Sequence, residues 1–123
     1  MLVIEDDTRL VSALAMLIED WGYECIAVGA LGTAAAALGP RIGELAVVVA
    51  DLSDGDHWGG DRSLEAVAGA VGPHVPVIAT STRPVQARHN GFGTVLAKPY
   101  EPEDLRVLLM RIAGPLPLAR QAC

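Results

Sequence analysis

The chain has 123 residues, the size of one ordinary domain, and 51% of them are hydrophobic although only 4% are aromatic. Aliphatic side chains and alanine must therefore build the core. The formal net charge of −6 argues against a surface for nucleic acids or membranes. No apolar run reaches the roughly 18 residues that span a bilayer, and the N-terminus lacks the basic start of a signal peptide. We therefore expect a cytoplasmic protein with reduced cysteines.

The first half of the chain alternates short apolar runs with helical patterns. Helical spacing is clearest at positions 10, 11, 14, 17 and 18, which are apolar, and Gly22 then ends the pattern. The run at residues 45–50 is apolar throughout, which is typical of a strand buried on both faces. We expect strands at residues 2–4, 24–28 and 45–50, and helices at residues 9–20 and 31–38, the second ending at Gly39-Pro40.

The second half continues the alternation. Pro76 is tolerable near the start of a strand. Pro102 suits the first turn of a helix, and the acidic residues in that turn are stabilised by the positive end of the helix dipole. We expect helices at residues 61–71, 84–89 and 101–113, and strands at residues 75–79 and 93–97. The domain then covers residues 1–113. Residues 114–123 form a C-terminal tail that begins Gly-Pro-Leu-Pro and cannot continue the helix.

This alternation predicts βα units and a doubly wound α/β fold, in which a parallel sheet is covered by helices on both faces. Such sheets bind ligands beyond the carboxyl ends of their strands. Chemically active residues gather at those ends: Glu5 and Asp6 follow the first strand, Asp51 the third, Ser81 the fourth and Lys98 the fifth. Lys98 is also the only lysine in the chain. The pattern predicts one small, charged site.

Four segments in chain order resemble the motifs of the receiver (CheY-like) domain of two-component response regulators. They are Val3-Ile4-Glu5-Asp6-Asp7, Val48-Val49-Ala50-Asp51, Val75-Pro76-Val77-Ile78 leading to Ser81, and Lys98-Pro99-Tyr100. Each segment alone is a weak signal, but the four together, each at a strand end, are specific. The resemblance covers nearly the whole chain, from Leu2 to about Ala113. It implies a five-stranded, flavodoxin-like sheet with strand order 2-1-3-4-5.

The resemblance also implies roles for single residues. Asp51 matches the aspartate that accepts a phosphoryl group from a histidine kinase or a histidine phosphotransfer protein. Lys98 matches the lysine that pairs with the phosphoryl oxygens. Ser81 matches the hydroxyl residue that moves to switch the domain, although the neighbouring Thr80 and Thr82 leave a one-residue alternative open. The residues that match the family's Mg²⁺ ligands are Glu5, Asp6, Asp51 and the backbone carbonyl of Ser53.

Three departures from the family's pattern bear on function. Val95 replaces the aromatic residue that usually lies three positions before the lysine, so an aromatic rotamer change cannot report phosphorylation there. The stretch from Ser81 to Lys98 is short, which predicts a shortened or missing fourth helix. Residues 53–60 replace the usual turn after the acceptor. The last two features are similar to single-domain receivers of alphaproteobacterial type.

Two functions are open at this point. The first is a receiver that takes a phosphoryl group on Asp51 and signals by changing how it binds an output protein, which the sequence does not name. Such a protein is not an enzyme on an external substrate. The second is a pseudo-receiver, a phosphorylation-independent interaction or dimerisation module. Homodimerisation fits either function, and neither requires direct contact with nucleic acid or membrane. The acids and the lysine favour the first function, whereas Val95, the altered loop after Asp51 and the shortened fourth helix favour the second.

Overall fold

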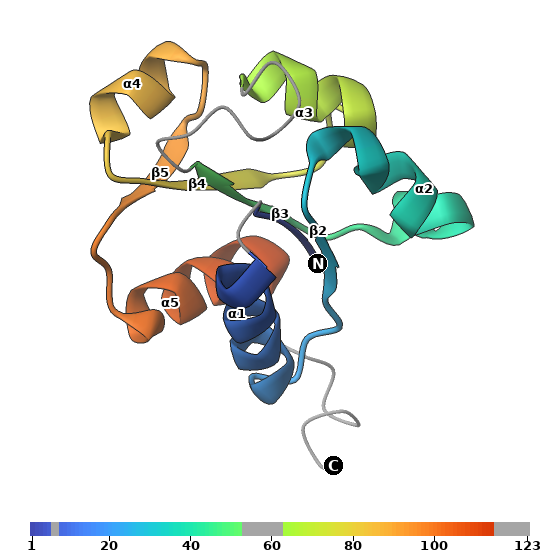
Figure 1. Cartoon of the computed structure of the whole chain (residues 1–123), viewed down its shortest axis with the longest axis horizontal. Helices are drawn as coiled ribbons and strands as arrows, with labels where there is room; N and C mark the ends of the chain where they lie inside the picture. The colour runs from blue at the N-terminus through green and yellow to red at the C-terminus, as the bar shows by residue number, and fades with distance from the viewer. Residues whose placement is uncertain (6–7, 53–62, 115–123) are drawn as a thin grey trace.

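The computed structural model describes residues 1–5, 8–52 and 63–114. In this part of the chain, five parallel strands form one sheet in the order β2-β1-β3-β4-β5 (Figure 1). The strands are β1 (Leu2–Ile4), β2 (Ile26–Val28), β3 (Val48–Leu52), β4 (Val77–Ser81) and β5 (Thr94–Ala97). The predicted α/β fold and its strand order are therefore confirmed.

The helices cover both faces of this sheet (Figure 1). They are α1 (Thr8–Asp20), α2 (Ala34–Leu38), α3 (Leu64–Val71), α4 (Pro84–His89) and α5 (Pro102–Ala113), with 3₁₀ segments η1 (Leu31–Thr33) and η2 (Gly39–Glu44). α1 and α5 lie against one face, and α2, α3 and α4 lie against the other. With six residues, α4 is the shortened fourth helix that the sequence predicts.

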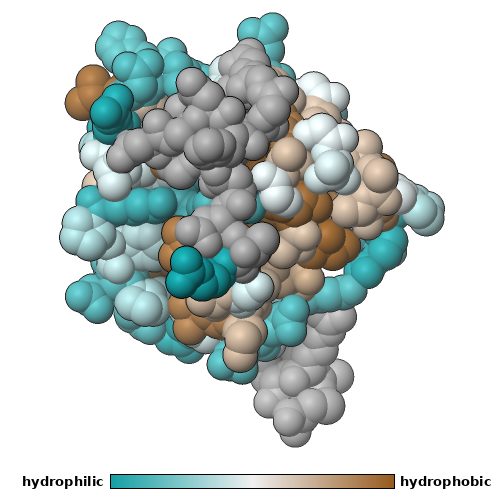
Figure 2. Space-filling view, viewed as in Figure 1, coloured by the Kyte–Doolittle hydropathy of each residue, from teal (hydrophilic) through white to brown (hydrophobic). Residues whose placement is uncertain are grey.

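The core has two layers because successive residues of a strand point to opposite faces of the sheet. In β3, Val49 packs on the side of α1 and α5, whereas Val48 and Ala50 pack on the side of α2 and α3. All three residues are completely buried. Hydrophilic residues line the side of the molecule near α4 and α5, and hydrophobic residues gather toward the middle of the face drawn in Figure 2. Aliphatic side chains dominate both layers, as the composition requires.

Two strands extend further than the sequence predicts. β3 ends at Leu52 and β4 at Ser81, two residues beyond each predicted end. The ladder between these strands pairs Asp51 with Thr80 and Leu52 with Ser81. A strand buried on both faces has no alternating pattern that would mark its limits, so its pairing partner sets them. As a result, Asp51 and Ser81 lie within strands rather than just beyond them.

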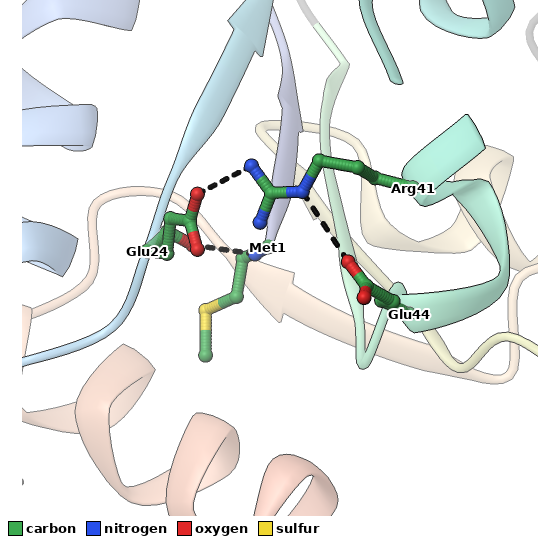
Figure 3. Close-up of polar contacts among 4 residues, drawn as sticks. All are labelled: Met1, Glu24, Arg41 and Glu44. Carbon is green, nitrogen blue, oxygen red and sulfur yellow. Dashed lines mark hydrogen bonds and ion pairs between the residues drawn. The ribbon is translucent and has the colours of Figure 1, made fainter. Parts of the chain in front are cut away.

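α2 ends at Leu38 with Gly39 as its C-cap, as the sequence predicts. The chain then continues as the 3₁₀ segment η2, which the sequence does not predict. Arg41 of this segment reaches the carboxylates of Glu24 at 2.5 Å and Glu44 at 3.3 Å, and the Met1 ammonium donates to the backbone carbonyl of Glu24 at 2.5 Å (Figure 3). These side chains are about half exposed or more. Such pairs add little to stability, but they link the segments that precede β1, β2 and β3.

The helix α5 begins with a capping box. Glu101 and Asp104 each accept a hydrogen bond from the other's backbone amide, and Pro102 takes the first helical position, where no amide proton is needed. Further along the helix, Leu105 and Leu109 are completely buried against the sheet. One face of this helix is therefore apolar and packs on the sheet.

Shortening the buried face of α5 should cost more stability than shortening its exposed face. Leu109→Ala should lower the free energy of unfolding by about 2–5 kcal/mol, because it leaves a cavity between α5 and the sheet. Met110→Ala is the control, since Met110 is 43% exposed, and it should cost less than about 1 kcal/mol. Urea unfolding followed by circular dichroism measures both losses. Equal losses would contradict the packing of α5.

Candidate functional site

Two acidic residues lie side by side at the carboxyl edge of the sheet. The pairing of β1 with β3 places Ile4 opposite Ala50, so Glu5 and Asp51, the next residues, are level with each other on neighbouring strands. Glu5 is 1% exposed and Asp51 is 5% exposed. Burial of two carboxylates is costly unless other groups compensate their charge. This edge of the sheet therefore needs cationic or hydrogen-bonding partners.

Lys98 supplies one of these partners. It follows β5, and its backbone amide donates to the Ser81 carbonyl at 2.8 Å, which fixes the start of its side chain. Its Nζ forms an ion pair with Oδ1 of Asp51. The two side chains are 22% and 7% exposed, whereas every other ion pair that joins two described residues is at least 43% exposed on both sides. The solitary lysine of the sequence thus forms the one shielded pair of this set.

Thr80 supplies a second partner. Its hydroxyl donates to the same Asp51 oxygen, Oδ1, at 2.8 Å, and its side chain is 0% exposed. The strand register explains the contact, because Thr80 of β4 lies directly opposite Asp51 of β3. Sequence reasoning weighed Thr80 only as a neighbour of Ser81. The hydroxyl-rich run Thr80-Ser81-Thr82 was the available signal, but the register that selects Thr80 is not readable from it.

Ser81 occupies the last position of β4 and is 5% exposed. Its Oγ accepts a hydrogen bond from the backbone amide of Arg83 at 2.9 Å. Arg83 is the N-cap residue of α4. Ser81 therefore lies near the acidic edge but is bound to the loop that leads into α4, and its switch role stays a prediction.

Tyr100 lies close enough to the acidic pair to respond to its charge. Burial raises the pKa of its phenol, and the negative charges of Asp51 and then Glu5 raise this pKa further. The side chain is partly buried and packs against the core layer under α1 and α5. Tyr100 is thus a partly buried neighbour of the acidic pair on the side of α1 and α5.

The described donors fit a hard divalent cation. Mg²⁺ prefers carboxylate oxygens, and Glu5 and Asp51 present two carboxylates at neighbouring strand ends. The other two predicted ligands, Asp6 and the Ser53 carbonyl, lie outside the described residues. Within the described ranges, no group of three or more histidine, cysteine, aspartate or glutamate side chains is placed to hold a metal. Glu5 and Asp51 are therefore the described part of the predicted ligand set.

Other sequence expectations can be placed as well. Val95 is partly buried against the core layer under α2, α3 and α4. The predicted C-terminal tail lies outside the described residues except for Gly114. No helix in the described part of the chain has the length and apolar character that a membrane span requires.

The chain matches no protein-family model, and the comparison with curated proteins finds no match. Solved structures do resemble it. Chemotaxis protein CheY4 from Vibrio cholerae shares 19% identity, with a TM-score of 0.69 over 90% of this chain and 95% of that one. The receiver domain of NtrX from Brucella abortus shares 22% identity, with a TM-score of 0.71 over 94% and 98% of the two chains.

A third similar structure is the receiver domain of a sensor histidine kinase from Pseudomonas aeruginosa, which contains a magnesium ion in its active-site cleft. It shares 20% identity, with a TM-score of 0.69 over 93% of this chain and 96% of that one. Identities in this range establish the fold alone. The chain therefore has the fold of CheY-like receiver domains, and its function must be argued from its own residues.

The ion pair between Lys98 and Asp51 should be energetically coupled. In a double-mutant cycle of Lys98→Met and Asp51→Asn, we expect a coupling energy of about 1–3 kcal/mol, because the pair is shielded from water. The matched control is the exposed pair of Arg106 and Glu103, for which coupling should stay below about 0.5 kcal/mol. Chemical unfolding of the parent, single and double variants measures both. Equal coupling in the two cycles would contradict the shielded pair.

The ionisation of Tyr100 should report the acidic pair. Asp51→Asn should lower the pKa of Tyr100 toward its ordinary value of 10.0 but leave it above that value, because burial is the larger cause of the increase. Since the folded protein holds the phenolic proton more tightly, this contribution to stability is complete below about pH 10 and lost as the pH rises through the Tyr100 pKa. Ultraviolet titration of the Tyr100 phenolate in a Tyr23→Phe background measures this pKa. An unchanged pKa in Asp51→Asn would place Tyr100 away from the site.

Proposed function

We propose that this chain is a phosphorylatable receiver of a two-component signalling system and that Asp51 is its phosphoacceptor. The observation that best supports this is the buried Asp51 carboxylate, which has Glu5 beside it and both Lys98 and Thr80 on one of its oxygens. This group lies at the carboxyl edge of a parallel sheet, where such folds bind their ligands.

The proposed reaction is transfer of a phosphoryl group from a phosphohistidine to Asp51. The bond between phosphorus and the imidazole nitrogen breaks, its electron pair returns to the imidazole, and a bond forms between phosphorus and an Asp51 carboxylate oxygen. Lys98 balances the charge of Asp51 before transfer and that of the phosphoryl oxygens after it. Mg²⁺ bound by Glu5, Asp51 and the proposed ligands Asp6 and Ser53 would offset repulsion between carboxylate and phosphoryl oxygens.

Ser81 is the proposed switch residue. Its oxygen accepts the bond from the Arg83 amide, so its own proton is free to be donated to a phosphoryl oxygen. Because Arg83 caps α4, movement of Ser81 toward Asp51 would disturb the start of this short helix. Binding of Ser81 to the phosphoryl group would thereby change the surface that an output protein binds.

The proposed partners follow from this chemistry. A histidine kinase or a histidine phosphotransfer protein would supply the phosphoryl group in the cytoplasm, and a separate protein would read the phosphorylated surface. The chain would assist only its own phosphorylation and dephosphorylation. Homodimerisation is compatible with this proposal.

A pseudo-receiver is the second candidate, and two observations favour it. Val95 stands where receivers usually have an aromatic switch residue, and α4 has only six residues. Such a protein would bind its partner without phosphorylation. Metal binding separates the two candidates, since a pseudo-receiver has no need of it.

Calorimetry tests the proposed function directly. Titration with Mg²⁺ should give saturable binding, and subsequent beryllium fluoride, a mimic of the aspartyl phosphate, should bind only in the presence of Mg²⁺. Asp51→Asn should abolish the fluoride response because it removes the oxygen that the mimic must join. A folded parent protein that binds neither Mg²⁺ nor beryllium fluoride would contradict the proposal and favour the pseudo-receiver.

A further inference from the structure

The Asp51 carboxylate has an asymmetric environment. Oδ1 receives both the ammonium of Lys98 and the hydroxyl of Thr80. The Thr80 contact is shielded completely from water, since this side chain is 0% exposed and lies within the central ladder of the sheet. A hydrogen bond to a buried carboxylate is charge-assisted and therefore strong. Thr80 is thus part of the reacting group's surroundings and more than a core residue.

Thr80 and Ser81 are held in different ways, although they are neighbours. Thr80 lies opposite Asp51 in the β3–β4 ladder, so its backbone cannot move without breaking the sheet. Ser81 ends the strand and is bound to the loop before α4. From this difference, and resting on the proposed function, we infer that Thr80 is a catalytic residue that sets the lifetime of the Asp51 acyl phosphate, while Ser81 serves the conformational response.

The chemistry of hydrolysis explains how Thr80 acts. A water molecule attacks phosphorus, the bond between phosphorus and the Asp51 oxygen breaks, and its electron pair returns to the carboxylate. Inorganic phosphate leaves with the water oxygen, and the protons of the water pass to phosphate and solvent. The hydroxyl of Thr80 bonds an anionic carboxylate more strongly than the ester-like carbonyl of the acyl phosphate. Its hydrogen bond therefore strengthens as the bond breaks, which favours hydrolysis.

Removal of this hydroxyl should lengthen the lifetime of the phosphorylated state. Thr80→Val keeps the shape of the side chain, and we expect the acyl phosphate to persist about fivefold longer. The reason is that the lost hydrogen bond is roughly twice as strong to a charged acceptor as to a neutral one, so its loss slows hydrolysis. The probe is acetyl phosphate with Mg²⁺, followed by removal of the donor and intact-mass measurement over time. Thr94→Val on β5 is the matched control and should keep the parent lifetime.

A second pair of variants guards against loss of folding in Thr80→Val. Thr80→Ser and Thr80→Ala differ from each other only by the hydroxyl, and the serine variant should hydrolyse its acyl phosphate several-fold faster than the alanine variant. Ser81→Ala should lengthen the lifetime less than Thr80→Val does and should instead reduce the change in amide chemical shifts that phosphorylation causes around α4.

The outcomes separate the two proposals. Equal lifetimes in Thr80→Val, Thr94→Val and a phosphorylated parent would overturn the role of Thr80 and leave the proposed function intact. A longer lifetime in Ser81→Ala than in Thr80→Val would assign the role to Ser81 and overturn ours. A folded parent that forms no acyl phosphate would overturn both, which a negative metal titration would show independently.

Discussion

The ion pair between Lys98 and Asp51 reaches from the end of β5 to β3, across the strand β4 that lies between them. This arrangement solves an electrostatic problem, because the sheet buries Glu5 and Asp51 next to each other and no other described cation pairs with Asp51. It also favours a hydrogen-bonding residue near the end of β4. The hydroxyl of Thr80 bonds Asp51 there, where an aliphatic side chain would leave the carboxylate less satisfied.

The same constraint gives this edge of the sheet a rigid part and a movable part. Asp51 and Thr80 belong to the longest strand pairing among the described residues, so their geometry is fixed before any ligand arrives. By contrast, α4 is six residues long and buries only Ala87 among its side chains. Elements with little buried apolar surface open at low cost in free energy. Phosphorylation of Asp51 would therefore change the conformation of α4 more readily than that of any strand in the central sheet.

The sequence predicted most of this arrangement because the alternation of buried strands and helices follows from composition and spacing. It also placed Glu5, Asp51 and Lys98 together, since parallel strands align their carboxyl ends. It did not predict that Thr80 contacts Asp51, because that contact depends on the register of β3 against β4. A strand that is apolar on both faces carries no periodic signal for its register or its ends. Strand pairing in three dimensions was needed to distinguish Thr80 from Ser81.

The central claim is that Asp51 accepts a phosphoryl group, and locating the modified residue tests it most directly. The protein would be incubated with acetyl phosphate and Mg²⁺, treated with borohydride to reduce the acyl phosphate to homoserine, and digested for peptide mass spectrometry. The account predicts homoserine at position 51 and its loss when Lys98 is replaced by methionine. Homoserine at another aspartate, or at none in a folded and magnesium-treated sample, would contradict it.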